Sequence, residues 1–355
     1  MESRDRQVNG RMKILIVNNM VPFLRGGAES LATNLVRHLR RYGHDADLLR
    51  VPFRWEPAHR ILDEMLACRM MRVNNVDRII GLKFPAYLIP HPHKTLWVVH
   101  QFRQAYDLAE SGHSHLVNDP TGQELRRSIT AADNECLAES DGISTISRVV
   151  SDRMLRFNNV PSHVLHPPVD DADDFKPLSS DNYIFCGGRI NSFKRQKLLV
   201  QAMRHTTSKI KLVVAGPPDN PADGVQLERI IDKHKLHDRV TLELGFLKRE
   251  RLVDLVNRSL ACAYVPYDED YGYVTLEAFY AGKPVITTHD AGGVLDFVTD
   301  QLTGRIVDPT PESLANAIDE FAENRQATVA LGKAARDDIH DRNINWPSTV
   351  RRLVA

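Results

Sequence analysis

Short apolar runs recur along the chain, separated by stretches long enough for one helix each. Residues 13–18 form a continuous apolar run that ends in polar residues, which is typical of a buried parallel strand. After Gly26 and Gly27, leucines and a valine recur at helical spacing over residues 29–42, and Gly43 follows as a stop signal. A strand, a glycine turn and a helix predict the opening unit of a doubly wound α/β domain.

This alternation of predicted strands and helices is interrupted once and then resumes. Residues 166–177 are rich in proline and aspartate, which favours an extended linker. Further strands are predicted at residues 79–80, 95–99, 142–146, 183–186, 211–215, 240–244, 260–265 and 284–288. Because crossovers in parallel sheets are right-handed, the strand ends of each domain should emerge on one edge, where ligands bind in open α/β sheets.

These patterns predict two domains, which suits a chain of 355 residues. We expect a flexible tail over residues 1–11, a first Rossmann-like domain over 12–175 and a second over 176–340. Trp346, Val350 and Leu353 recur at helical spacing near the end of the chain. We expect residues 341–355 to form a helix that crosses back and packs on the first domain, with an ordinary terminal helix as the alternative.

The most specific candidate site is the segment over residues 269–286. It places Glu269 and Gly272 in the loop after a predicted strand, and Glu277 on the helix that follows. The backbone amides of Gly272, Tyr273 and Val274 would then point toward a bound group at a helix N-terminus, where an anion such as phosphate is favoured. Two carboxylates beside a phosphate would repel it unless they accept hydrogen bonds from sugar hydroxyls.

Other motifs complete this pattern: Gly188-Arg189 with Lys194 after a strand, Gly26-Gly27-Ala28-Glu29 near the start, and Gly292-Gly293 with Asp296. Together they resemble the retaining glycosyltransferases of family 4, over nearly the whole chain from Lys13. The resemblance implies the glycosyltransferase-B fold, in which two Rossmann-like domains face each other across a cleft. It also implies a role in polysaccharide biosynthesis. The expected reaction moves a hexose-type sugar from a UDP-sugar, or next GDP-mannose, to a saccharide, lipid-linked or small-molecule acceptor.

The resemblance also assigns roles to residues. Glu269 would contact hydroxyls of the donor sugar, Glu277 the ribose, and His100 the transferred sugar, while Arg189 and Lys194 would clamp the diphosphate. Neutralising the leaving group is the main electrostatic task of such a site. Family members are thought to use the donor phosphate as the base, so Glu269 is not assigned as a nucleophile.

The expected site residues are as follows. The catalytic set is His100, Arg189, Lys194 and Glu269. The donor-binding set is Gly26, Gly27, Gly188, Arg189, Lys194, Phe246, Leu247, Glu269, Tyr271, Gly272, Tyr273, Val274 and Glu277. The acceptor-side candidates are Phe84, Tyr87, Arg103 and Tyr106.

Two positions depart from the family pattern. Arg195 stands where family members often have glycine after the lysine, and Asp296 stands where glutamate is more frequent. Each candidate also has a structural alternative. Arg189 and Lys194 could be a surface pair, Glu269 could lie in a solvated acidic loop, and the glycine pair near the start could be an ordinary turn. A non-catalytic nucleotide-sugar binder, or an epimerase or phosphorylase on the same fold, stays open.

No cofactor or metal is expected. The chain has no Gly-x-Gly-x-x-Gly motif, which argues against a nicotinamide enzyme. Asp268-Glu269-Asp270 only superficially matches the Asp-x-Asp pair of metal-dependent transferases, because it belongs to the loop described above. The four cysteines are widely spaced and do not suggest a zinc or iron-sulfur site.

Charge and hydropathy bear on partners and location. The net charge of zero argues against a dedicated nucleic-acid binder. Residues 1–100 nevertheless carry about 16 Lys and Arg against about 9 Asp and Glu, including Arg37, Arg40, Arg41, Arg69, Arg72 and Arg78. This excess indicates either a solvated helix face or peripheral contact with an anionic membrane. With no long apolar run and no signal-peptide pattern, we expect a cytoplasmic location.

Overall fold

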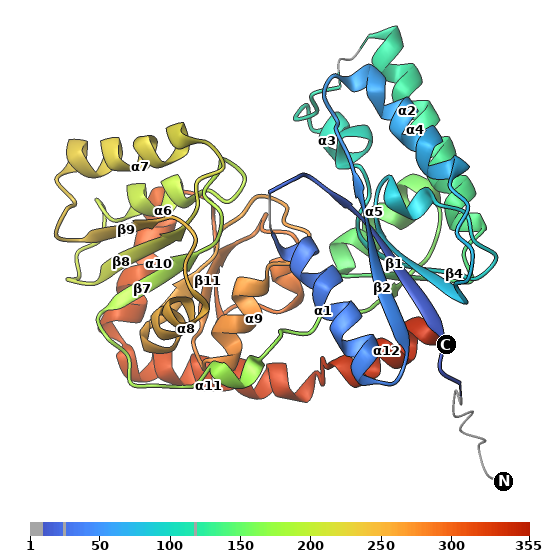
Figure 1. Ribbon diagram of the computed structural model, residues 1–355. Coiled ribbons are helices and arrows are strands. Elements are labelled where there is room, and N and C mark those ends of the chain that lie inside the picture. Colours follow the sequence, from blue (N-terminus) through green and yellow to red (C-terminus); the bar gives the residue numbers. More distant parts are fainter. Residues whose placement is uncertain (1–9, 24–25, 117–118) are drawn as a thin grey trace. The chain divides into compact units, whose positions relative to one another are not determined.

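A computed structural model describes residues 10–23, 26–116 and 119–355, which form two compact units. The first unit comprises Met1–Pro168 and Ile344–Ala355, and the second comprises Val169–Asn343. Each unit is built on its own six-stranded parallel sheet (Figure 1). The division falls after Pro168, a few residues before the boundary expected at 175/176. Most of the expected tail, residues 1–9, lies outside the described residues.

The first sheet has the strand order β2-β1-β3-β4-β5-β6, with every neighbouring pair parallel. Its strands are β1 (Lys13–Met20), β2 (Asp45–Pro52), β3 (Arg78–Lys83), β4 (Lys94–His100), β5 (Gly142–Thr145) and β6 (His163–Val164). The central strands β3 and β4 are buried along almost their whole length. This explains their continuous apolar sequences, because a central parallel strand is covered by helices on both faces. The edge strands β2 and β6 were not predicted from the sequence.

Helices cover both faces of this sheet. They are α1 (Gly27–Arg41), α2 (Ile61–Met70), α3 (Asp107–Glu110), α4 (Pro120–Ala138), α5 (Arg148–Asn158) and α12 (Trp346–Val354). Helices α1 and α12 lie side by side, and the His38 and Trp346 rings stack with centroids 4.4 Å apart. The three apolar residues that predicted the terminal helix are all buried. The carboxyl-terminal helix therefore packs in the first unit, although it follows the second unit in the sequence.

The second sheet has the order β12-β11-β10-β7-β8-β9. Its strands are β7 (Tyr183–Gly187), β8 (Lys211–Gly216), β9 (Val240–Leu244), β10 (Ala261–Ala263), β11 (Val285–Thr288) and β12 (Gly304–Val307). The chain builds outward from β7 to β9, returns to place β10 beside β7, and then builds outward in the other direction. This is the 3-2-1-4-5-6 order of doubly wound folds, and the direction reverses between β7 and β10.

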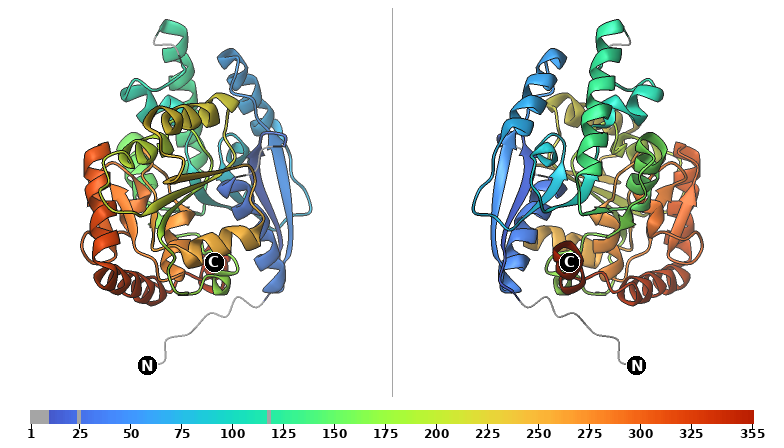
Figure 2. Two further views of the ribbon diagram at one scale, coloured as in Figure 1. Left: turned by 90° about the vertical axis from the view of Figure 1, so that its left-hand side faces the viewer. Right: turned by 90° about the vertical axis from the view of Figure 1, so that its right-hand side faces the viewer.

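The helices of the second unit follow from this winding. They are α6 (Gln196–Ala202), α7 (Pro221–His234), α8 (Arg249–Arg258), α9 (Tyr273–Tyr280), α10 (Pro311–Glu323) and α11 (Arg325–Asp341). Helices α6, α7 and α10 bury Leu199, Leu227 and Ile318 in one core with the sheet. The red helix α10 can be followed along the outer side of this unit in Figures 1 and 2. Helices α8, α9 and α11 pack on the other face.

Part of the arginine excess of the first unit is used internally. Arg69 forms ion pairs with Glu135 at 2.8 Å and with Glu139 at 2.8 Å, which joins α2 to α4. Arg78 donates a hydrogen bond to Thr95 at 2.9 Å. These two side chains therefore have structural partners and are not simply a solvated face. Within the described ranges, no helix combines the length and the apolar character needed to span a bilayer.

Candidate functional site

The reversal of strand order brings the two most informative loops of the second unit together. Strands β7 and β10 are neighbours, and their carboxyl ends point to the same edge of the sheet. The loop after β7 carries Lys194, and the loop after β10 carries Glu269. In doubly wound sheets, the edge at such a reversal is where ligands bind. The structure therefore places these two residues at the position where the fold itself favours a site.

Lys194 and Glu269 form an ion pair there. The Lys194 ammonium contacts the Glu269 carboxylate and donates a hydrogen bond to the Tyr264 hydroxyl at 2.7 Å. Only 15% of the Lys194 side chain and 23% of the Glu269 side chain are exposed. Burial lowers the pKa of Lys194, but the interactions with Tyr264 and Glu269 outweigh it and hold the pKa above its usual value. The ammonium is therefore a fixed cation with one carboxylate partner.

Arg189, the other expected clamp residue, has a different partner. Its guanidinium donates to the two carboxylate oxygens of Asp219, at 3.1 and 3.3 Å, and Asn191 donates to the same carboxylate at 2.8 Å. The Arg189 side chain is 48% exposed. An exposed pair of this kind contributes about 0 to 1 kcal/mol, so exchanging Asp219 for a phosphate group would cost little. The structure thus leaves Arg189 able to turn toward an anion at this edge.

Glycines let the backbone loops approach one another at this edge. Gly188 has φ +120°, and Gly216 at the end of β8 has φ +147°. A Cβ atom on Gly216 would lie 2.0 Å from the Gly188 carbonyl oxygen. Gly216 therefore permits close packing of the β7 and β8 loops, while Gly188, expected as a donor-binding residue, adopts a backbone conformation that favours glycine.

The acidic loop after β10 is held by a second glycine pair. The Gly293 amide donates to the Glu269 carbonyl at 2.7 Å, and the Glu269 amide donates to the Ala291 carbonyl at 3.2 Å. Gly292 has φ +69°, and a Cβ atom there would lie 2.5 Å from the Glu269 carbonyl oxygen. The Gly292-Gly293 motif thus fixes the backbone that carries Glu269.

Helix α9 begins directly after this loop. Gly272, with φ +87°, occupies its cap position and has no side chain to cap the first amides. The first-turn amides of Tyr273 and Val274 therefore start a helix whose N-terminus suits an anion. Glu277 lies one turn further along and is half-buried, and burial raises its pKa to about 7 against the opposing charge of Arg249.

The other expected donor-binding residues differ in their exposure to solvent. Phe246 is 75% exposed in the loop after β9, and Leu247 beside it is partly exposed. Tyr271 is buried, with its ring 5.1 Å from Tyr273 and 5.6 Å from Phe297. The assignment of Tyr271 to the donor-binding set stays a prediction. Its ring belongs to the aromatic packing beneath the loop, where it contacts both neighbouring rings edge to face.

The expected residues of the first unit lie at the carboxyl edge of its sheet. Gly26 and Gly27 start α1, where the Gly26 amide donates to the Glu29 carboxylate at 2.9 Å. His100 ends β4, and its Nδ1 lies 2.6 Å from the Gln101 carbonyl oxygen. Because a carbonyl oxygen can only accept, Nδ1 carries the proton in this arrangement.

The acceptor-side candidates are mostly interior residues. Tyr106 is buried, and its hydroxyl donates to Asp133 at 2.6 Å. Phe84 and Tyr87 are also buried. In the structure these three aromatic side chains pack in the core of the first unit, and their role as acceptor contacts stays a prediction. Arg103 is mostly buried and forms an ion pair with Asp107 at 2.6 Å.

Several functional side chains were missed from the sequence. Tyr264, which binds Lys194, lies directly after β10, and its place at a strand end is the signal that could have found it. Asp219 and Asp290, the partners of Arg189 and Arg195, lie in the loops after β8 and β11. Both carboxylates lie in loops that follow the carboxyl ends of strands in the second sheet. The described residues contain no group of three or more His, Cys, Asp and Glu placed to hold a metal ion.

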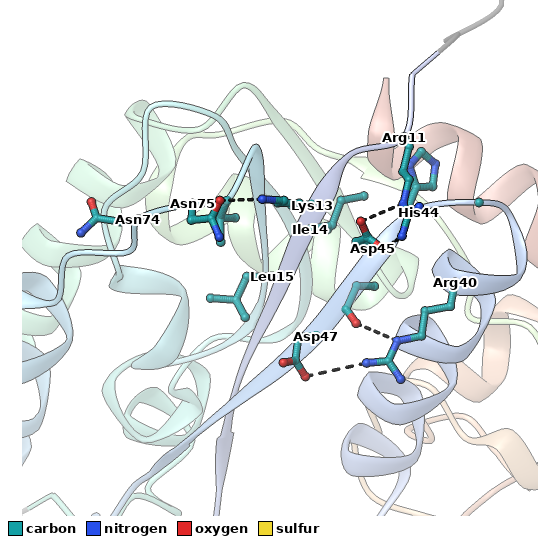
Figure 3. A pocket seen from close by; sticks show the side chains of 13 residues that line it. Arg11, Lys13, Ile14, Leu15, Arg40, His44, Asp45, Asp47, Asn74 and Asn75 are labelled. Atoms are coloured by element: carbon teal, nitrogen blue, oxygen red, sulfur yellow. Dashed lines mark hydrogen bonds and ion pairs between the residues drawn. The ribbon is translucent and has the colours of Figure 1, made fainter.

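A hollow of the structure lies elsewhere, in the first unit. It has a volume of about 780 Å³ and opens at the amino ends of β1 and β2 in the first unit (Figure 3). Its charged groups mostly satisfy one another: Arg11 pairs with Asp45, and Lys13 donates to Asn75 at 2.6 Å. Ligands of open α/β sheets bind at the opposite edge, so we do not assign this hollow to the site.

Comparison with known proteins agrees with this geometry. Residues 170–338 match the family model "Glycosyl transferases group 1", which is almost the whole second unit. The chain is 27% identical over 194 residues to the mouse (Mus musculus) alpha-1,3/1,6-mannosyltransferase ALG2, covering 50% of this chain and 45% of that protein. It is 26% identical over 277 residues to the D-inositol 3-phosphate glycosyltransferase of Mycolicibacterium smegmatis, covering 73% of this chain and 62% of that protein. The chain thus spans about half to three-fifths of the length of these relatives.

Solved structures share the whole architecture. Anabaena Alr3699/HepE, solved in complex with UDP and glucose, superposes with a TM-score of 0.73 at 16% identity, covering 97% of this chain and 98% of that chain. WaaG, a glycosyltransferase involved in lipopolysaccharide biosynthesis, superposes with a TM-score of 0.71 at 14% identity, covering 96% of this chain and 99% of that chain. At these identities the likeness shows the fold.

The fold and the site at the strand reversal define a protein of two Rossmann-like units of the glycosyltransferase-B type. Residues 170–338 match the family model of group 1 glycosyl transferases, and the chain shares the fold of the solved structures named above.

Proposed function

We propose that the chain is a retaining transferase that moves a hexose-type sugar from a nucleotide-diphosphate donor to a saccharide or lipid-linked acceptor. The single observation that carries this proposal is the Lys194–Glu269 ion pair at the strand reversal of the second unit. A cation and a carboxylate held side by side match a donor in which a diphosphate is joined to a hydroxyl-rich sugar.

In this proposal the diphosphate lies against Lys194 and the N-terminus of α9. Lys194 exchanges part of its contact with Glu269 for the phosphate oxygens, and Arg189 leaves Asp219 to join it. The positive charges then stabilise the negative charge that develops on the leaving diphosphate as the glycosidic bond breaks. These side chains would perform this task without a metal ion.

The two carboxylates serve the hydroxyl groups of the donor. Glu269 accepts hydrogen bonds from the transferred sugar, and Glu277 accepts them from the ribose. The Glu269 carboxylate is bound by Lys194 and is not poised as a free nucleophile. The acceptor proton passes to the donor phosphate, and the sugar keeps its configuration. His100 is proposed to bind the transferred sugar.

The relatives support a nucleotide sugar as the donor class, and the particular donor is our proposal. A UDP-sugar is the first candidate, because Alr3699/HepE was solved with UDP and with UDP-glucose. A mannosyl donor such as GDP-mannose is second, because one relative is named a mannosyltransferase. We further propose a cytoplasmic location, with peripheral membrane contact through the arginine-rich first unit if the acceptor is lipid-linked.

The test begins with thermal unfolding in the presence of UDP, GDP, ADP and their sugar conjugates, all with EDTA. A ligand that binds only the folded state stabilises it by about 2.7 kcal/mol at a concentration of 100 times its Kd. We expect one nucleotide class to raise the melting temperature and its sugar conjugate to be turned over. If no nucleotide raises the melting temperature, the proposed function is wrong.

Two lysine variants link this result to the site. Lys194→Met is expected to lose the nucleotide shift and to lower turnover by at least about 100-fold, because removing one preorganised charge contact costs about 3 kcal/mol in such sites. Lys197, on α6 and exposed, lies three residues away and provides the matched control Lys197→Met. Equal activity of both variants would remove the diphosphate clamp from the proposal.

A further inference from the structure

Arg195 adopts a backbone conformation that is unusual for its side chain. It follows Lys194, caps α6, and has φ +54° and ψ 31°, in the left-handed region. Glycine adopts this region without strain, whereas a residue with a Cβ atom needs other contacts to hold it there. The left-handed backbone at Arg195 therefore needs specific contacts to stabilise it.

The guanidinium of Arg195 supplies these contacts. It donates to both carboxylate oxygens of Asp290, at 2.9 and 2.7 Å, and to the Thr288 hydroxyl at 2.8 Å. It also donates to the carbonyl oxygens of Val265 at 2.8 Å and Pro266 at 2.7 Å. A planar, bidentate arginine pair of this kind is geometrically restrictive, and only 18% of the Arg195 side chain is exposed.

These contacts connect the loop of Lys194 to the loop of Glu269. The Asp290 carbonyl accepts a hydrogen bond from the Asp268 amide at 2.8 Å, directly before Glu269. Val265 and Pro266 begin the same loop at the end of β10. A backbone hydrogen bond from Tyr267 to Phe193, at 2.7 Å, runs alongside this connection. Arg195 is thus bonded directly to the start of the loop that carries Glu269, and through Asp290 to Asp268 in the same loop.

We propose that Arg195 and Asp290 form a clasp that positions Lys194 against Glu269. In this role they are positioning residues, since they act through Lys194 and Glu269. The inference rests on the proposed function for its effect on turnover. A lysine ammonium is a point charge on a flexible stem, so its place depends on its loop. A misplacement of about 1 Å in such a site can lower the rate about 100-fold.

Arg195→Gly separates the backbone conformation of this residue from the contacts of its side chain. Glycine keeps the left-handed backbone and removes the clasp, so the fold of the loop is expected to survive. Lys235 is the matched control, because it also has φ +54°, caps α7 and is exposed. Lys235→Gly makes the same backbone change with no clasp to lose. Asp290→Asn weakens the clasp from its other side.

Turnover gives the first readout. For Arg195→Gly we expect kcat to fall at least tenfold and the donor KM to rise less than it does for Lys194→Met, because the ammonium of Lys194 stays in the site and loses only its exact place. The double variant Arg195→Gly with Asp290→Asn should be no slower than Arg195→Gly alone, since both changes remove one contact. Lys235→Gly should match the natural protein. A purely structural role would instead lower activity in proportion to the unfolded fraction.

Amine labelling gives a second readout that needs no activity. The rate at which acetic anhydride modifies Lys194 is measured by mass spectrometry on the folded protein. We expect Arg195→Gly and Asp290→Asn to raise this rate at least threefold, as Glu269→Gln should, and Lys235→Gly to leave it unchanged. Unchanged labelling in both clasp variants overturns the proposal. Faster labelling in a protein that turns over no nucleotide sugar supports the clasp and refutes the proposed function.

Discussion

Glu277 gives the most quantitative prediction, because burial has raised its pKa from 4.5 to about 7. Between these two values the folded protein holds a proton that the unfolded chain has lost. For a carboxyl group whose pKa is raised on folding, the free energy of unfolding falls as pH rises through this window. Above pH 7 both states are ionised, and the folded state bears the full cost of a half-buried charge.

The size of this cost follows from the shift. A difference of about 2.5 pKa units corresponds to at most about 3.4 kcal/mol at about 1.36 kcal/mol per unit. Because the side chain is half-buried and water can screen it, we expect about 1 to 3 kcal/mol. Glu277→Gln removes the charge and keeps the shape. The variant should match the natural protein near pH 4.5 and be more stable by about 1 to 3 kcal/mol at pH 8.

The measurement is urea unfolding of the ligand-free protein at pH 5, 6, 7 and 8. The spectroscopic signal must report the unfolding of the second unit, because this unit contains α9. Glu228, exposed on α7, provides the control Glu228→Gln, for which no pH-dependent difference is expected. The same Glu277 variant should bind nucleotide more weakly, since an ionised acceptor for the ribose is lost. If Glu277→Gln gains no stability between pH 5 and pH 8, the burial argument for this residue is wrong.

Two further substitutions test packing, one in each unit. Gly292→Ala should lower stability by about 1 to 3 kcal/mol and weaken nucleotide binding, because the new Cβ atom would lie 2.5 Å from the Glu269 carbonyl oxygen. Gly43→Ala, at φ +90° in open space, is the control for backbone strain, and equal effects of the two variants would contradict the steric argument. Trp346→Ala should destabilise the first unit by about 3 to 5 kcal/mol, because it removes a buried ring stacked on His38. Chemical unfolding measures both, and a loss under 1 kcal/mol for Trp346→Ala would show that α12 adds little to the first unit.

The sequence predicted the central strands well and most of the edge strands poorly. The edge strand β9 was predicted with its observed bounds, 240–244, and the central strands were predicted to within a few residues. The edge strands β2, β6 and β12 were not predicted. Their residues alternate between buried and exposed or carry charges such as Arg305, so they lack the continuous apolar run on which the prediction depended.

The sequence also indicated the loops of the site but not the contacts within it. Arg189 and Lys194 were expected to act together, whereas the structure pairs Arg189 with Asp219 and Lys194 with Glu269. Tyr106 and Tyr271 were expected near a ligand, and both are buried. An aromatic residue in a polar loop has the same local pattern whether it faces solvent or the core.

By itself, therefore, the sequence determined the α/β class, the position of the main elements and the glycine-rich loops at the strand ends. These depend on local periodicity and on backbone freedom at single residues, which a sequence displays directly. The tertiary structure alone decided that β10 returns beside β7, that Lys194 faces Glu269, and that Arg195 is bonded to Asp290. Such contacts join residues about 70 to 95 positions apart, and they form only when packing fixes the order of the strands and the direction of each side chain.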